Sequence, residues 1–145
     1  MTDTVLVTGA TGFIAKHIVA ELLRQGYAVR GTARDAAKGL DIAQKAMARA
    51  GVDATRLSMV AADLTRDEGW DAAASGCRYA MHVASPFPIT QPADADEVVR
   101  PAREGTLRVL RAAAKAGAPR VVLTSSTVAV MYPASHEPGH VYSEA

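Results

Sequence analysis

The chain has 145 residues, 49% of them hydrophobic, and its 16 Lys and Arg residues nearly balance 15 Asp and Glu residues, leaving a net charge of +1. This length suits one domain, residues 1–145, with a hydrophobic core of its own. The near-neutral charge argues against a nucleic-acid partner, and no apolar run reaches the roughly 18 residues that a membrane span requires. The single cysteine, Cys77, has no partner for an internal disulfide, and the opening Met-Thr-Asp lacks the features of a signal peptide. We therefore expect a cytoplasmic protein with no membrane partner.

The chain begins with a strand, a glycine turn and a helix in direct succession. Residues 5–8 form a short, mostly β-branched apolar run that ends in a threonine, and Gly9 and Gly12 follow it. Apolar residues then recur at helical spacing over 14–23, and Gly26 comes where a left-handed C-cap is favoured. The pattern predicts one strand, one tight turn and one amphipathic helix.

A strand, a glycine turn and a helix N-terminus in this order form an anion site, because free backbone N–H groups and the helix dipole converge there. Gly9 permits the tight turn, and Gly12 lets a pyrophosphate approach the backbone without meeting a Cβ atom. Ala15 takes the third, helix-packing position of the dinucleotide fingerprint, which is Gly or Ala. The spacing Gly-x-x-Gly-x-x-Ala also fits an ordinary turn, but its place between strand and helix favours phosphate binding.

Strands and helices alternate along the rest of the chain. We expect strands at 27–33, 57–61, 78–83 and 120–124, and helices at 41–50, 67–75 and 94–116. Pro101 predicts a kink or a restart in the last helix, and from Val128 onward the regular pattern fades. The alternation predicts an α/β fold, a Rossmann-type doubly wound parallel sheet with strand order 3-2-1-4-5. A cofactor would lie across the switch point between strands 1 and 4.

The end of the second strand bears on the choice of cofactor. An enzyme that uses NAD usually has an acidic residue there, about 20 residues past the glycines, and this chain has Ala33 followed by Arg34. The planar guanidinium of Arg34 suits a 2′-phosphate, which favours NADP. Two alternatives stay open: Arg34 is an ordinary surface residue, or Asp35 binds the ribose of NAD.

Polar and small residues follow the other strands. Asp63 is placed to accept a hydrogen bond from adenine while Leu64 packs on the ring, although Asp63 also fits the N-cap of the next helix. The segment 82–86 offers small residues to a nicotinamide ribose, and we expect His82 to be a packed, hydrogen-bonded strand residue rather than an acid–base group. Hydroxyl groups of residues 124–127 come where a nicotinamide would lie.

No metal site is expected. His136 and His140 follow in the final loop without the spacing of a ligand pair, and the single cysteine adds no further ligand.

Ordered motifs run along the whole chain: Val7-Thr8-Gly9-Ala10-Thr11-Gly12-Phe13-Ile14, Arg34-Asp35, Ala62-Asp63-Leu64-Thr65, Gly76-Cys77, His82-Val83-Ala84-Ser85-Pro86, Glu104-Gly105-Thr106 and Leu123-Thr124-Ser125-Ser126. At this spacing the chain resembles the extended short-chain dehydrogenases/reductases. Within that family it is most similar to the branch of dihydroflavonol reductases, cinnamoyl-CoA reductases and microbial carbonyl reductases.

The resemblance implies reduction of an aldehyde or ketone with NADP(H), with NAD(H) as the other possible cofactor. It implies that Ser126 helps bind the carbonyl oxygen, while a tyrosine delivers the proton and a lysine holds the nicotinamide ribose. The residues that we expect at the cofactor are Gly9, Thr11, Gly12, Phe13, Ile14, Arg34, Asp63, Leu64, Val83, Ala84, Ser85 and Thr124.

Three features depart from the family pattern. Ala15 replaces the usual third glycine, and Met131 stands where the flavonoid-reducing members have an asparagine, which argues against a flavonoid substrate. The Tyr-x-x-x-Lys motif of the family lies tens of residues beyond its serine and does not occur within this chain. We therefore expect the chain to be the N-terminal part of a longer enzyme, truncated before its C-terminal substrate-binding part and inactive alone.

Two other functions remain open. One is an epimerase or dehydratase acting on nucleotide sugars, which Arg34 and the missing acid after the second strand disfavour. The other is a regulatory module that binds NADP without catalysis, which the hydroxyl run at 124–127 disfavours. A homodimer stays open as the assembly.

Overall fold

A computed structural model describes residues 2–86, 90, 92, 94–131 and 139 of the chain. Its centre is a five-stranded parallel sheet in the order β3-β2-β1-β4-β5, as the sequence predicts. The strands are β1 (Thr4–Val7), β2 (Ala28–Ala33), β3 (Leu57–Ala61), β4 (Tyr79–His82) and β5 (Arg120–Leu123). The helices are α1 (Phe13–Arg24), α2 (Ala36–Arg49), α3 (Trp70–Ala74), α4 (Asp96–Lys115) and α5 (Thr127–Met131).

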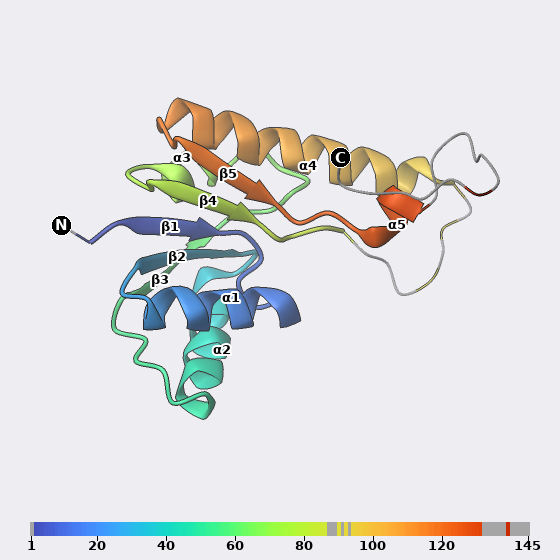
Figure 1. Cartoon of the computed structure of the whole chain (residues 1–145). Helices are drawn as coiled ribbons and strands as arrows, with labels where there is room; N and C mark the ends of the chain where they lie inside the picture. The colour runs from blue at the N-terminus through green and yellow to red at the C-terminus, as the bar shows by residue number, and fades with distance from the viewer. Residues whose placement is uncertain (1, 87–89, 91, 93, 132–138, 140–145) are drawn as a thin grey trace.

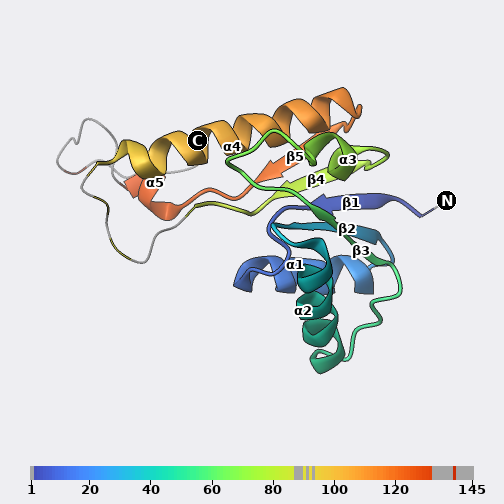
Figure 2. The same cartoon turned by 180° about the vertical axis from the view of Figure 1, so that it is seen from behind.

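The sheet is covered on both faces, with α1 and α2 on one side and α3 and α4 on the other (Figures 1 and 2). The central strand β1 shows the alternation that this arrangement requires. Val5 and Val7 pack into the core beneath α1 and α2, whereas Leu6 packs into the core beneath α3 and α4. All three side chains are buried, so β1 is apolar on both faces and holds the two halves of the fold together.

Helix α2 begins at Ala36, five residues before the predicted start. Asp35 caps it, because an Oδ1 atom accepts a hydrogen bond of 3.0 Å from the backbone N–H of Lys38. Gly39 then lets the helix lie against β2, since a Cβ atom there would be 2.5 Å from the Cβ of Ala33. The glycine interrupts the apolar pattern, so the sequence did not reveal this first turn.

Helix α3 begins at Trp70 rather than at residue 67. Gly69 precedes it with a φ of +87°, and a Cβ atom at Gly69 would lie 2.1 Å from the carbonyl oxygen of Ala61. Helix α4 continues through Pro101 as one element, so the restart considered from the sequence does not occur. The helix that follows β5, α5, was not predicted, because its five residues are too few for a periodic pattern.

No helix in the described part of the chain is long and apolar enough to cross a membrane. His136 and His140 lie outside the described residues.

Candidate cofactor site

A cavity of about 570 Å³ opens beside the carboxyl ends of β1, β2, β3 and β4. Its walls come from the end of β2, the segments that follow β1, β2, β3 and β4, and the start of α3. The lining residues are Gly9, Thr11, Thr32, Ala33, Arg34, Ala62, Asp63, Leu64, Thr65, Trp70, Ala84, Ser85 and Pro86. Many of the residues predicted to bind a cofactor are therefore brought together in one place.

The glycine turn forms the floor of this site. Gly9 has a φ of +62°, which a residue with a side chain rarely adopts, and its backbone N–H donates to Thr32 Oγ1 at 3.1 Å. The N–H of Gly12 donates back to the carbonyl of Gly9 at 2.8 Å, which closes the turn. A Cβ atom at Gly12 would meet nothing outside this turn and the first turn of α1. The backbone at Gly12 is thus open to a ligand.

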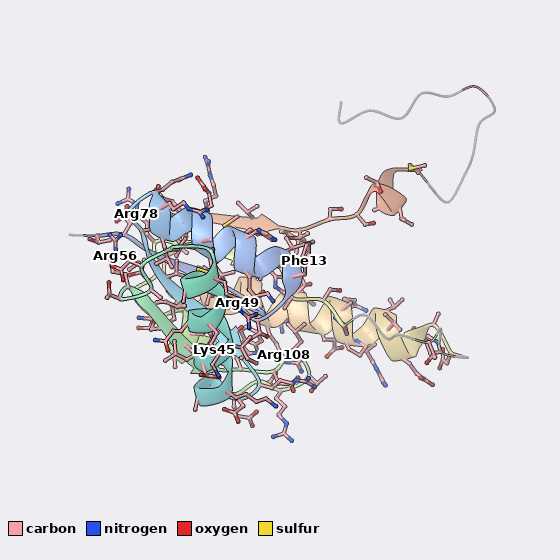
Figure 3. The ribbon with its side chains drawn as sticks, turned by 90° about the horizontal axis from the view of Figure 1, so that it is seen from below. Phe13, Lys45, Arg49, Arg56, Arg78 and Arg108 are labelled. Atoms are coloured by element: carbon pink, nitrogen blue, oxygen red, sulfur yellow. The ribbon has the colours of Figure 1, made fainter. Side chains whose placement is uncertain are left out.

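The N-terminus of α1 carries free donors. Its N-cap, Gly12, makes no side-chain hydrogen bond, and the first turn contains no acidic residue. The first hydrogen bond back to Gly12 comes from Lys16, so the N–H groups of Phe13 and Ile14 have no intrahelical acceptor. Phe13 is 77% exposed and Ile14 55% exposed, and Figure 3 shows Phe13 at this end of the helix. Free N–H groups and the helix dipole fit a diphosphate here.

Arg34 lies at the exposed end of β2 and lines the cavity. The neighbouring Asp35 uses its Oδ1 atom to cap α2, so this carboxylate has a structural role already. A cationic group therefore faces the cavity where an NAD-dependent enzyme usually has an acid.

Asp63 caps its own turn rather than a helix. Its Oδ1 atom accepts from the backbone N–H of Thr65 at 2.8 Å and from the Thr65 hydroxyl at 2.7 Å. These two bonds, together with the nearby guanidinium groups of Arg34 and Arg66, lower the pKa of Asp63 below its usual value. The N-cap of α3 is Gly69, so the alternative role of Asp63 as that cap is wrong.

Residues on α3 and α4 hold the segment that follows β3, and the sequence analysis did not identify them. The indole Nε1 of Trp70 donates to the carbonyls of Asp63 at 3.1 Å and Arg66 at 3.0 Å. Arg108 reaches from α4 (Figure 3), where it donates to the Leu64 carbonyl at 3.0 Å and pairs with Asp67. Side chains of α3 and α4 therefore fix the backbone of the segment that forms this wall of the cavity.

The segment after β4 is held by a buried polar network. The Oγ1 atom of Thr8 accepts from the backbone N–H groups of Val83 and Ala84, both at 3.0 Å. The same Oγ1 lies 2.8 Å from His82 Nδ1, and His82 Nε2 lies 3.1 Å from Thr106 Oγ1. His82 is 2% exposed, and burial lowers its pKa. As expected, His82 is a packed, hydrogen-bonded residue.

The hydroxyl run after β5 does not belong to the cavity lining. The backbone N–H of Thr124 continues the ladder by donating to the carbonyl of His82 at 3.0 Å. Ser126 is exposed, and its Oγ atom accepts from the N–H of Val128 at 3.2 Å, which caps α5. Neither residue lines the cavity, so their roles stay predictions. Gly12, Phe13, Ile14 and Val83 do not line the cavity either, so their contacts with a cofactor also stay predictions.

The sequence also gave no indication that the hydroxyls of Thr8, Thr32 and Thr106 support the site. Thr8 and Thr32 come at or near the ends of apolar strands, and Thr106 belongs to the Glu104-Gly105-Thr106 motif, for which the sequence indicates no role. For Thr8 and Thr32, a threonine beside a glycine at a strand end was the available signal. Within the described residues, no group of three or more His, Cys, Asp and Glu side chains is placed to hold a metal ion.

Comparison with known proteins gives three results that agree with this geometry. Residues 5–145 match the model of the NAD dependent epimerase/dehydratase family. Aldehyde reductase 2 of Sporidiobolus salmonicolor is 42% identical over 130 residues, which are 89% of this chain and 37% of that protein. Cinnamoyl-CoA reductase 1 of Oryza sativa subsp. japonica is 43% identical over 140 residues, which are 97% of this chain and 39% of that protein.

The fold is also similar to that of a solved reductase. The NADPH complex of yeast methylglyoxal/isovaleraldehyde reductase Gre2 superposes with a TM-score of 0.71 at 31% identity, covering 88% of this chain and 38% of that one. The chain thus spans about two fifths of the length of these relatives. Because the family model covers residues 5–145, nearly all of the sequence, the chain belongs to the NAD-dependent epimerase/dehydratase family of extended short-chain dehydrogenases/reductases.

Proposed function

We propose that this chain is the NADP(H)-binding part of an oxidoreductase that reduces an aldehyde or a ketone to an alcohol. One observation carries the proposal: the glycine turn and Arg34 lie on the same cavity at the carboxyl edge of a parallel sheet. An anion site and a separate cation suit a dinucleotide with a diphosphate and a 2′-phosphate. The similarity to reductases such as aldehyde reductase 2 supports the carbonyl substrate.

The chain's own groups divide the binding of such a cofactor among the strand ends. The turn from Gly9 to Gly12 and the free N–H groups at the start of α1 would hold the diphosphate. Arg34 would bind the 2′-phosphate, and Asp63 with Leu64 would contact the adenine. On the other side of the switch point, Ala84 and Ser85 would border the nicotinamide ribose.

The backbone N–H groups of Val83 and Ala84 are not available to this cofactor, because both are donated to Thr8. The segment after β4 therefore contributes its carbonyl groups and small side chains, and its position depends on the hydrogen bonds behind it. Thr124 would lie beside the nicotinamide at the end of β5.

When bound, the reduced cofactor supplies a hydride for the carbonyl carbon. The hydroxyl of Ser126 would donate a hydrogen bond to the carbonyl oxygen, where negative charge develops as the hydride arrives. The family resemblance assigns delivery of the proton to a tyrosine and orientation of the ribose to a lysine. Both belong to the Tyr-x-x-x-Lys motif, which residues 1–145 do not contain.

The arrangement around Arg34 favours this function over a nucleotide-sugar epimerase. Asp35, the acid that follows β2, uses its Oδ1 atom to cap α2, and Arg34 rather than Asp35 lines the cavity. The cofactor is therefore NADP(H), with NAD(H) bound more weakly.

The test is NADPH-dependent turnover of the intact protein against a panel of aldehydes and ketones. We expect loss of NADPH absorbance that requires the carbonyl compound and produces the alcohol. Turnover of a nucleotide sugar without net use of NADPH would contradict the proposal. NADPH binding without turnover of any carbonyl would indicate a regulatory module instead.

A further inference from the structure

Thr8 connects two strand ends that border the cofactor site. It follows β1 directly, its side chain is buried, and its hydroxyl oxygen accepts the N–H groups of Val83 and Ala84 from the end of β4. This one oxygen therefore takes two backbone donors from the segment that would border the nicotinamide ribose. If the oxygen turned away, both N–H groups would lose their acceptor.

The protonation state of His82 follows from counting donors and acceptors. The Thr8 oxygen already accepts two hydrogen bonds, so its own proton is left to donate, and His82 Nδ1 lies 2.8 Å away. Nδ1 must then be the unprotonated nitrogen, and the ring proton is on Nε2. Nε2 lies 3.1 Å from Thr106 Oγ1 on α4 and donates to it. The network therefore requires a neutral imidazole with its proton on Nε2.

The segment after β4 packs directly against the glycine turn, so a shift of one would displace the other. A Cβ atom at Gly9 would lie 2.9 Å from the Ala84 Cβ and 3.3 Å from its Cα, so the two backbones touch with no space between them. Gly9 is also held from the other side by Thr32 Oγ1. The position of Ala84 and the shape of the diphosphate turn are thus coupled.

From this arrangement we propose that His82 is a positioning residue: its neutral form orients the Thr8 hydroxyl to hold Val83 and Ala84, and its protonation releases that segment and weakens cofactor binding. The inference rests on the proposed function, because it concerns the same cofactor site. A proton on Nδ1 would face the Thr8 oxygen as a third donor, beside the N–H groups of Val83 and Ala84. The Thr8 proton would then lose Nδ1 as its acceptor. The Thr8 oxygen would have to accept three hydrogen bonds.

The surroundings of His82 favour the neutral form. Burial lowers the pKa of His82, so we expect the imidazole to become protonated only below the usual pH range for histidine. On the packed helices, Arg108 of α4 pairs with Asp67 and Glu104, and Asp71 of α3 pairs with Lys115. The two ring nitrogens meet the neutral hydroxyls of Thr8 and Thr106, and Leu123 of β5 is the ladder partner of His82. No carboxylate among the described residues forms an ion pair with the imidazole.

The experiment measures the dissociation constant of NADP⁺ with the intact protein over a series of pH values. It compares wild type with His82→Asn, whose side-chain oxygen can accept the Thr8 hydroxyl at the place of Nδ1 and does not titrate. The 2′-phosphate of the ligand titrates itself, with a pKa of about 6 for a phosphate monoester, but this contribution is common to both proteins. Hydrogen exchange of the Val83 and Ala84 amides is followed in the cofactor-free proteins.

In wild type we expect the dissociation constant to rise more steeply with falling pH than in His82→Asn, by up to about tenfold per pH unit for one linked proton. The Val83 and Ala84 amides should exchange faster over the same pH window, after correction for the intrinsic rate. Thr8→Ser keeps the hydroxyl and should keep the wild-type pH dependence.

Parallel pH curves for wild type and His82→Asn would overturn the proposal, as would exchange at Val83 and Ala84 that is indifferent to His82. If wild type bound no NADP⁺ at any pH, the proposed function would fail. The amide exchange would then still decide whether His82 holds the segment.

Discussion

Gly105 of α4 faces Leu64 so closely that a Cβ atom at Gly105 would lie 2.7 Å from the Leu64 Cβ and 2.9 Å from one of its methyl carbons. The contact joins a helix to the segment that forms the adenine side of the cavity. Arg108, on the next turn of α4, binds the Leu64 carbonyl at 3.0 Å. The same helix therefore sets both the side chain and the backbone of Leu64.

Gly105→Ala should accordingly destabilise the fold and displace Leu64. Overpacking of this kind typically costs about 1–3 kcal/mol, although alanine gains helix propensity relative to glycine. Denaturant unfolding measures the change. The matched test repeats Gly105→Ala in a Leu64→Gly background, where the clashing side chain is gone. In that background Gly105→Ala should reduce the free energy of unfolding by less. An equal reduction in both backgrounds would show that the close contact with Leu64 is not the cause.

Asp63 should make stability depend on pH at the acidic end. Its bonds to Thr65 exist in the folded state and lower the pKa below the ordinary value of 3.8, so the folded state binds this proton less readily than the unfolded chain. Its contribution is complete above that ordinary value and is lost as the pH falls through the lowered pKa.

The Asp63→Asn variant should therefore be less stable than wild type near neutral pH, and the difference should narrow in acid. Urea midpoints at several pH values measure it. The matched control is Asp53→Asn, because Asp53 makes the same kind of bonds to Thr55 away from the cavity. For both variants the difference in stability from wild type should narrow in acid. Only Asp63→Asn should also weaken NADPH binding. Equal NADPH affinity in Asp63→Asn and wild type would remove Asp63 from the adenine site.

The sheet and the glycine turn were predictable because their information is local. Val5 to Val7 carry the apolar pattern of a doubly covered strand, and the glycines that follow require a turn wherever the chain goes next. Strand order then follows from the general rules for right-handed crossovers. The cap of α2 was also local, in Asp35, but Gly39 hid the periodicity of its first turn.

The supports of the site were not predictable, because they join residues far apart in the chain. Thr8 and His82 are 74 positions apart, and Arg108 lies 44 positions after Leu64. Nothing in the local sequence of Thr8 indicates that its hydroxyl will meet two backbone N–H groups from another strand end. Ser126 is a different case: its bond to the N–H of Val128 is local, and its role at the carbonyl follows only from the family resemblance.

Ser126→Ala in the intact protein should lower kcat for carbonyl reduction by roughly 10²–10³ and leave NADPH affinity unchanged, by analogy with the loss of an oxyanion-hole donor. The variant also removes the cap of α5, which is worth about 1 kcal/mol. Ser126→Asp separates the two effects, since a carboxylate caps the helix but donates no hydrogen bond at neutral pH. It should be as inactive as Ser126→Ala. Wild-type turnover in either variant would assign the role to Ser125 or Thr127.

A protein consisting of residues 1–145 alone should bind NADPH weakly and reduce nothing. It contains no Tyr-x-x-x-Lys motif, whose tyrosine the family resemblance assigns as proton donor, and general acid catalysis is typically worth about 10²–10⁴. Val122 and Leu123 of β5 are 47% and 51% exposed, which should favour self-association. A turnover assay with NADPH measures reductase activity, and light scattering measures self-association. Clear carbonyl reduction that survives Ser126→Ala would contradict the assigned chemistry.

The choice of NADP over NAD depends on Arg34, the cation that lines the cavity after β2. Losing a charge-assisted hydrogen bond to the 2′-phosphate should cost about 1.5–3 kcal/mol of NADPH binding. NADH has no phosphate at this position, so its affinity should hardly change. Arg49 is the matched control, because it lies on the last turn of α2 (Figure 3), at the opposite end from Arg34.

The most direct measurement is therefore a calorimetric titration of wild type, Arg34→Ala and Arg49→Ala with NADPH and with NADH. Wild type and Arg49→Ala should prefer NADPH, and Arg34→Ala should lose that preference through weaker NADPH binding alone. Equal losses for both cofactors in Arg34→Ala, or a wild type that prefers NADH, would contradict an NADP(H) site at this cavity.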